Sequence, residues 1–232
     1  MTIGPVRILV TGFGGFPGVA NNPTERMVAA LRKHRPRLAR LGVTLELDVL
    51  PVVYAEIAPR LQTLAETIKP DAALHFGLAA RRKAFCVETR ALNRVSLLRP
   101  DAAGARARSR AIVPGAPFTA KSTFPSALIA AAMSSAGIKA RLSINAGDYV
   151  CNQTLYLSLA LMKAGSVGFI HIPRLARRRR TPDAAKTQRP TLDAAVRAAV
   201  IAILVMAVKL RGGLARNKAK LDPELDPAPF LT

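Results

Sequence analysis

The sequence predicts an α/β fold with a largely parallel sheet, and two observations carry this prediction. Short apolar runs rich in β-branched residues alternate along the chain with longer segments of helical periodicity. Gly, Pro or Asn residues bound most of these runs, as they do where a buried strand enters a loop. Strands that alternate with helices in this way build a parallel sheet that helices cover on both faces.

The N-terminal half opens on residues 6–11 (VRILVT), an apolar run that enters the glycine-rich sequence GFGGFPG and predicts a buried strand. A helix is predicted from Asn22 to about His34, because Asn22 is a good N-cap, Pro23 suits the first helical position and Glu25 lies three residues after the cap. The remaining elements predicted in this half are strands at residues 44–53 and 72–77 and a helix at residues 55–68.

In the second half, residues 84–95 are predicted to form a strand or a hairpin arm, and residues 99–118 a loop rich in Pro, Gly and Arg. Gly137 is a suitable C-cap for a helix that precedes it, and Gly212-Gly213 is expected to end the last helix. The predicted elements are helices at residues 125–137, 150–163 and 191–211 and strands at residues 142–145 and 167–173.

The length of 232 residues, half of them hydrophobic, is enough to bury a sizeable core. Because no Gly/Ser/Pro linker interrupts the chain, we expect one domain over residues 1–213 and a loosely ordered tail over residues 214–232. The first residues lack the features of a secretory signal. The longest apolar run, residues 198–208, is shorter than the ~20 residues that span a bilayer. A cytoplasmic protein without a membrane partner is expected.

The chain is strongly basic, with 35 Lys and Arg against 14 Asp and Glu, a formal net charge of +21. Such a charge is typical of proteins that bind nucleic acid or acidic partners. Aromatic residues make up only 5% of the chain and Trp is absent, so platforms for base stacking are scarce. Nucleic acid is therefore a possible partner that the sequence does not favour, and a solvated basic surface is the commoner explanation.

A metal site is not expected, because the chain has two Cys and three His and no CxxC or HxxxH spacing. Two cysteines also make no disulfide framework. His34 lies among basic residues on a helix end and is interpreted as a surface residue, whereas His75, at the end of a predicted strand, is interpreted as structural.

Cys151 lies just past Gly147, at the predicted start of a helix. A helix N-terminus stabilises a thiolate through its dipole and its free N–H groups, and the thiolate is the reactive form of the side chain. Cys151 is therefore a candidate nucleophile. An inert buried cysteine is an equally acceptable interpretation of its position.

Two further residues could complete a thiol-dependent site. His171 lies between Ile170 and Ile172 in an apolar strand, and it can act as a base toward a thiol and then as an acid toward a leaving amine. Glu88 lies in a mainly apolar segment, where an unpaired carboxylate is costly, and it is a candidate for orienting an imidazolium. The structural alternatives are a core histidine and a salt bridge from Glu88 to Arg90 or to another of the many arginines.

The glycine-rich loop after the first strand invites a phosphate-binding interpretation. Its order, GFGGFPG, matches neither of the common phosphate-binding patterns. Its two phenylalanines, Phe13 and Phe16, predict an apolar pocket instead.

Taken together, four motifs resemble, in order, those of the pyroglutamyl-peptidase I family (pyrrolidone-carboxylate peptidases), which are cysteine exopeptidases. They are TGF…F…NP from Thr11 to Pro23, Glu88 with Arg90, Ala91 and Asn93, the sequence AG-YVCN around Cys151, and GFIHIP around His171. The resemblance spans roughly residues 6–210. It implies a three-layer α/β/α sandwich with a mainly parallel, mixed, twisted sheet, as in phosphorylase- and hydrolase-like folds.

The resemblance also implies an activity and a set of residue roles. A Cys151–His171–Glu88 triad would remove an N-terminal pyroglutamyl residue from peptides, without a cofactor or metal and commonly as a homotetramer or another homo-oligomer. The oxyanion would bind the backbone N–H of Cys151 and one from residues 97–99. An apolar slot with a few amide-type hydrogen bonds suits the small lactam, and the residues implied to form it are Phe13, Phe16, Asn22, Tyr149 and Val150.

Two positions and one segment depart from the family pattern. Cys86 stands where Ser or Thr is usual, two residues before Glu88, and Leu78 stands where a polar residue is common. Residues 174–180 (RLARRRR) replace a segment that is usually apolar and acidic. These differences leave a second hypothesis open, in which a catalytically altered member of the same fold binds nucleic acid or a protein partner through its basic surface.

Overall fold

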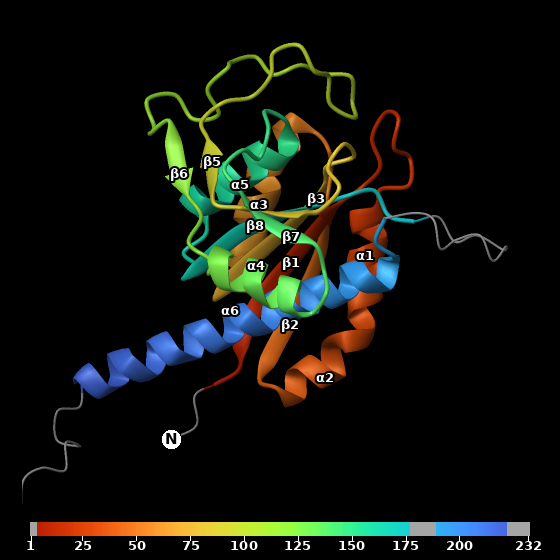
Figure 1. Ribbon diagram of the computed structural model, residues 1–232. Coiled ribbons are helices and arrows are strands. Elements are labelled where there is room, and N and C mark those ends of the chain that lie inside the picture. The colour runs from red at the N-terminus through yellow and green to blue at the C-terminus, as the bar shows by residue number, and fades with distance from the viewer. Residues whose placement is uncertain (1–3, 177–188, 222–232) are drawn as a thin grey trace, which may run out of the picture.

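The computed structural model describes residues 4–176 and 189–221 (Figure 1). Its elements follow in the order β1 (Val6–Phe13), α1 (Pro23–Leu31), a 3₁₀ turn (Arg32–His34), α2 (Arg35–Arg40), β2 (Val43–Leu50), α3 (Tyr54–Ile68), β3 (Ala72–Leu78), β4 (Phe85–Glu88), β5 (Arg90–Leu92), β6 (Thr119–Lys121), α4 (Ser126–Ser135), β7 (Ala140–Ser143), α5 (Val150–Leu161), β8 (Ser166–Ile172) and α6 (Leu192–Leu221).

The main sheet has six strands in the order β2-β1-β3-β8-β4-β7. The pairs β1–β2, β1–β3, β3–β8 and β4–β7 are parallel, whereas β4 and β8 are antiparallel. Strands β5 and β6 form a separate antiparallel pair. The predicted mainly parallel, mixed sheet is thus confirmed.

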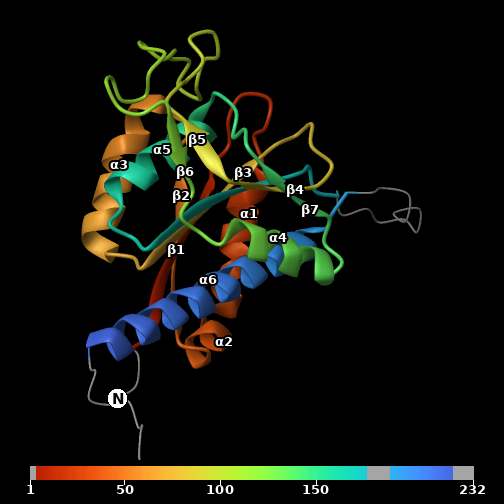
Figure 2. The same cartoon turned by 60° about the vertical axis from the view of Figure 1, so that its left-hand side comes forward.

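Helices cover both faces of this sheet, and each face has its own apolar core. One core joins α1, α2, α4 and α6 to the sheet through residues such as Met27, Leu38, Met133 and Ile203. The other joins α3 and α5 to the opposite face through residues such as Leu61 and Leu155. Figure 2 shows α4 and α6 on one side of the strands and α3 and α5 on the other. The three-layer α/β/α sandwich is therefore confirmed.

Strand alternation decides which side chains meet beneath α5. In β8, Ile170 and Ile172 belong to the core on the α6 side, whereas Phe169 belongs to the core on the α5 side. Because successive side chains of a strand point to opposite faces, His171 lies on the α5 face with Phe169. In β4, Val87 faces the α6 side, so Glu88 also lies on the α5 face.

Three element predictions need correction. The helix predicted over residues 191–211 continues through Gly212-Gly213 to Leu221, since an isolated Gly pair lowers helix propensity but does not forbid helical backbone. Residues 84–95 form two strands in different sheets, β4 and β5. Helix α2 was not predicted, because Pro36 looks like a breaker in sequence but occupies the first turn of the helix, where Pro is tolerated.

Two predictions fall partly outside the described residues. The basic run 174–180 is described only to residue 176, and residues 222–232 of the predicted tail are not described. A single domain over residues 1–213 remains a prediction. In the part of the chain that the structure does describe, no helix is both long and apolar enough to cross a membrane.

Candidate active site

Glu88 and His171 come together through the one antiparallel strand pair of the main sheet. The register of β4 and β8 places Cys86 opposite His171 and Glu88 opposite Phe169. Since Glu88 and His171 share the α5 face, the Nδ1 atom of His171 lies 2.8 Å from Oε1 of Glu88. Glu88 is fully buried and His171 is 5% exposed, so water does not compete for this contact.

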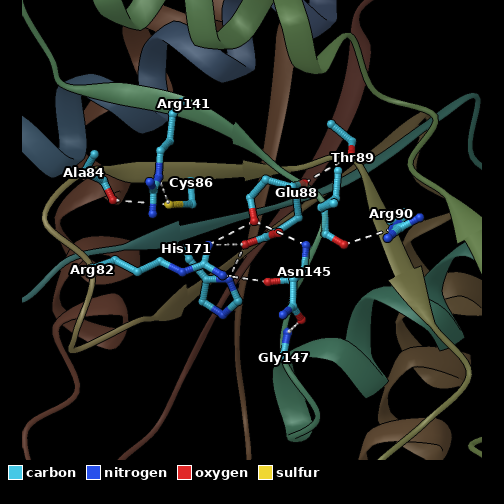
Figure 3. A network of polar contacts seen from close by, with 12 residues as sticks. Arg82, Ala84, Cys86, Glu88, Thr89, Arg90, Arg141, Asn145, Gly147 and His171 are labelled. Atoms are coloured by element: carbon cyan, nitrogen blue, oxygen red, sulfur yellow. Dashed lines mark hydrogen bonds and ion pairs between the residues drawn. The ribbon is translucent and has the colours of Figure 1, made fainter.

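A guanidinium group reaches the same carboxylate oxygen. Nη1 of Arg82 donates to Oε1 of Glu88 over 2.7 Å, and Nη2 donates to the carbonyl oxygen of Asn145 over 2.6 Å (Figure 3). Burial acts to raise the pKa of Glu88. The hydrogen bond and charge of His171, together with the charge of Arg82, outweigh burial and lower this pKa below its usual value. Glu88 is therefore ionised at neutral pH.

Cys151 is the second residue of α5. The first bond of this helix joins Gln153 N–H to the carbonyl of Tyr149, so the N–H of Cys151 has no partner four residues earlier in its own helix. Gly147, with φ of 89°, provides the left-handed backbone that turns the chain into the helix. Residues 145–151 thus present the thiol and a free N–H at the same point.

Gly77 on β3 makes room for the thiol. A Cβ added at Gly77 would lie 2.8 Å from Sγ of Cys151 and 2.7 Å from Cζ of Phe169. Gly77 pairs with His171 in the register of β3 and β8. Cys151 therefore rests against the strand position next to His171, although no hydrogen bond joins these two described side chains.

The Cys151 thiol is neutral in this environment. Burial, followed by the charge of Glu88, raises its pKa to about 12, against opposing effects of its own backbone N–H and of Arg82. A thiol with this pKa is protonated at neutral pH. Its reactivity then depends on a base that removes the proton as a bond forms.

Cys151 and His171 line one cleft of about 490 Å³. Of the residues implied to bind substrate, Phe16 and Tyr149 line it as well. Arg82 forms part of the wall, and the other lining residues are Pro17, Leu78, Ala79, Arg99, Pro100, Ala146, Gly147 and Asp148. The cleft is within the size range of small-molecule sites and combines apolar walls with a few polar groups.

The other three predicted pocket residues lie outside the cleft lining. Phe13 is buried in the α5-side core, with its ring centroid 6.3 Å from that of Phe169. Asn22 caps α1, accepting from the N–H of Thr24 over 3.1 Å and donating to the carbonyl of Gly14 over 3.0 Å. Val150 is fully buried at the start of α5. Their roles in substrate binding remain predictions.

The loop that is expected to supply a second oxyanion donor lies at the rim of the cleft. Arg99 lines the cleft and its guanidinium lies 3.5 Å from the carboxylate of Asp148. The hydroxyl of Tyr149 donates to the carbonyl of Pro100 over 2.9 Å. These contacts tie Arg99 and Pro100 to the segment that precedes Cys151.

Sequence reasoning missed Arg82 and the role of Asn152. In the sequence Arg82 is only one member of a basic cluster, and its contact with Asn145 spans 63 positions, so no local pattern reveals it. Asn152 is fully buried and accepts from the N–H of Leu92 while donating to the carbonyls of Leu92 and Arg94. Its place directly after Cys151 is the only signal that the sequence offers.

Two other reactive side chains lie near the site. His75 is fully buried and shares a 2.8 Å hydrogen bond with Thr11, and burial lowers its pKa to about 3. Cys86 is also fully buried, and Nε of Arg141 donates to its sulfur over 3.4 Å. Neither lines the cleft. No cluster of three or more His, Cys, Asp or Glu that could hold a metal occurs among the described residues.

Comparisons with known proteins agree with this arrangement. A family model described as pyroglutamyl peptidase matches residues 6–209. The pyrrolidone-carboxylate peptidase of Pyrococcus furiosus is 38% identical over 172 residues, which cover 72% of this chain and 81% of that protein. The pyrrolidone-carboxylate peptidase of Erwinia tasmaniensis is 31% identical over 206 residues, covering 88% of this chain and 92% of that protein.

Solved structures give the same result. A mutant pyrrolidone carboxyl peptidase from Pyrococcus furiosus superposes with a TM-score of 0.78 at 33% identity, covering 88% of this chain and all of that one. The pyrrolidone carboxyl peptidase of Thermococcus litoralis has a TM-score of 0.76 at 26% identity and covers 98% of this chain.

Proposed function

Because the chain belongs to the pyroglutamyl peptidase family, we propose that Cys151, His171 and Glu88 hydrolyse the amide bond after an N-terminal pyroglutamyl residue of peptides. Cys151 is the nucleophile, His171 the general base and acid, and Glu88 the residue that orients His171. The observation that carries these roles is the 2.8 Å contact between Glu88 and Nδ1 of His171 beside the cleft that Cys151 lines.

The first step forms a thioester. Since the thiol of Cys151 is neutral at rest, Nε2 of His171 takes its proton as the sulfur attacks the carbonyl carbon of the pyroglutamyl residue. Nδ1 of His171 then donates to Glu88, whose charge stabilises the imidazolium. When the tetrahedral intermediate collapses, the carbon–nitrogen bond breaks and His171 returns the proton to the leaving amine.

The second step is hydrolysis of the thioester. His171 takes a proton from water, and the resulting hydroxide attacks the acyl carbon. The carbon–sulfur bond breaks, the sulfur regains a proton from His171, and pyroglutamate leaves. In both tetrahedral intermediates, the free N–H of Cys151 donates to the oxyanion, and we expect the second donor from residues 97–99.

The lactam is proposed to bind between Phe16 and Tyr149. These aromatic residues and Leu78 give the cleft apolar walls, while the backbone of residues 146–149 offers polar groups. Phe13 supports this region from below, because its ring packs on Phe169, whose centroid lies 4.8 Å from that of His171.

A fluorogenic pyroglutamyl amide tests the proposal directly. We expect the protein to cleave it under reducing conditions, Cys151→Ser to lose at least about 1,000-fold in kcat, and alkylation to stop the wild type. Cys86→Ala is the matched control, because it removes the only other thiol, which is fully buried, and should retain most activity. A folded wild-type protein without turnover, or a Cys151→Ser variant with normal turnover, contradicts the proposal.

We also propose that the chain forms a homo-oligomer, a tetramer or a dimer. Large apolar side chains are exposed on the edge strand β7 and directly after it: Leu142 is 49% and Ile144 62% exposed. Light scattering on the full chain, with Ile144→Ser as the comparison, measures the mass; a monomer at all concentrations contradicts this proposal. A cytoplasmic location and activity without a cofactor remain predictions.

A further inference from the structure

A second hollow adjoins the active-site cleft. It has a volume of about 450 Å³ and shares Arg82 with the cleft that holds Cys151 and His171. Basic side chains dominate its lining, which contains no Asp or Glu and no aromatic residue among those that the structure describes. Its basic members are Arg81, Arg82, Lys83, Arg174 and Arg189.

Most of these cations are available to a ligand. Arg82 is committed to Glu88 and Asn145. The other four are exposed, and none of them forms an ion pair with a carboxylate of the described residues. Four cations around one hollow repel one another, so an anionic ligand would relieve an unfavourable charge distribution.

The hollow continues along the surface. A neighbouring one of about 210 Å³ shares Lys83 and Arg189 with it and adds Lys139 and Arg197. We call the two hollows together the basic groove. The groove starts at Arg82, at the wall of the active-site cleft, and extends away from it past α4 and the start of α6.

The groove borders the end of β8, just after His171. His171 is followed by Ile172, the last residue of β8, and then by Pro173 and Arg174. The carbonyl of Ile172 accepts from the N–H of Ala79 over 2.9 Å. Residues 79–83 and 173–174 therefore lie together just beyond His171. Because the general acid contacts the leaving nitrogen, a peptide bound with that nitrogen at His171 can extend toward these residues.

From these observations we propose that the basic groove binds acidic side chains of the peptide that follows the pyroglutamyl residue, so that acidic pyroglutamyl peptides are the preferred substrates. The inference rests on the function proposed above. A peptide fits better than nucleic acid, because no described aromatic residue in the larger hollow could stack a base and because this hollow shares Arg82 with the active-site cleft.

Matched peptides test the preference. We compare kcat/KM for pGlu-Ala-Glu-Glu-Ala and pGlu-Ala-Gln-Gln-Ala, which differ only in charge, and we expect the acidic peptide to be favoured about tenfold at low salt, as two or three exposed ion pairs would give. The preference should shrink at high salt, since solvent-exposed charge pairs are screened.

The decisive variant is Arg81→Gln/Arg174→Gln/Arg189→Gln, which leaves Arg82 in place. We expect this triple variant to lose the preference for the acidic peptide while cleaving a small pyroglutamyl amide as fast as the wild type. A matched control, Arg32→Gln/Arg37→Gln/Arg40→Gln, removes the same charge from exposed arginines of the 3₁₀ turn and α2 and should keep the preference.

Direct binding separates this inference from the proposed function. With Cys151→Ala, we measure anisotropy of the two peptides labelled at the carboxyl end and expect tighter binding of the acidic one, lost in the groove variant. A wild-type protein that does not cleave the pyroglutamyl amide contradicts the proposed function, but the binding measurement still tests the groove. Equal affinity for both peptides overturns the groove proposal, as does a DNA or RNA oligonucleotide that binds the groove while the acidic peptide does not.

Discussion

One carboxylate oxygen of Glu88 receives both His171 and Arg82, and this shared contact organises the site at the scale of single residues. Arg82 also holds the carbonyl of Asn145, which precedes the turn into α5. It therefore links the residue that orients His171 to the segment that carries Cys151. We infer that Arg82 is a positioning residue, acting on the reacting atoms through these two groups.

Replacing Arg82 with Gln should lower kcat by about 10- to 100-fold, with a smaller change in KM, because the carboxylate and the 145–151 segment lose a shared anchor. The charge of Arg82 lowers the pKa of Glu88. Its removal raises that pKa, so the acid limb of the pH profile should move to higher pH. Arg82→Lys retains the charge, so the acid limb of its pH profile should stay at the wild-type position, whereas its kcat should remain below that of the wild type. An unchanged profile in Arg82→Gln contradicts the role.

Gly77→Ala should displace the Cys151 thiol, since the added Cβ would lie 2.8 Å from its sulfur. We expect activity to fall by about 100-fold and the rate of thiol alkylation to change. Gly14→Ala is the control: a Cβ there meets nothing closer than 3.9 Å and should be tolerated. Normal turnover in Gly77→Ala would show that the thiol does not depend on this space.

At the scale of elements, most strands and helices were predictable because their periodicity is local. Strands β1, β2, β3 and β8 and helices α3 and α5 lie within a few residues of their predicted ranges. The split of residues 84–95 was not predictable, because Thr89 separates two strands that pair with different distant partners. The pairing of Glu88 with His171 was a hypothesis from residue type. The role of Arg82 could not be predicted, because its contacts depend on how the loop after β3 folds.

Asn152 joins α5 to the strand β5 through three hydrogen bonds to backbone groups. Asn152→Ala should lower the free energy of unfolding by about 3 kcal/mol, because those groups would be left buried without partners. Urea denaturation measures this change. Thr154→Val on the same helix is the control: its buried hydroxyl has no partner among the described residues, so its removal should be nearly neutral.

At the scale of the whole molecule, buried His75 makes stability depend on pH. Burial holds its pKa at about 3 in the folded state, against 6.5 for a histidine that is accessible to water. Between these values the unfolded chain binds a proton that the folded chain excludes. Stability contributed by neutral His75 is therefore complete above pH 6.5 and is lost as the pH falls toward about 3.

His75→Asn should flatten this dependence. For the wild type we expect the free energy of unfolding to fall between about pH 6.5 and 4.5 by about 1.4 kcal/mol per pH unit from this residue alone. In the variant, which has no titrating ring, the free energy of unfolding should fall less steeply by that amount. Denaturant titrations across this pH range measure both slopes, and equal slopes would show that His75 does not carry the effect.

Strand β8 comes late in the chain yet occupies the middle of the sheet, between β3 and β4. During synthesis, β3 and β4 emerge before β8. Until residue 172 has emerged, each of these two strands has one edge whose final partner strand is missing. Open strand edges are sites of intermolecular pairing. A nascent or truncated chain that stops before β8 is thus expected to aggregate, and the insertion of this single strand both completes the sheet and brings His171 to Glu88.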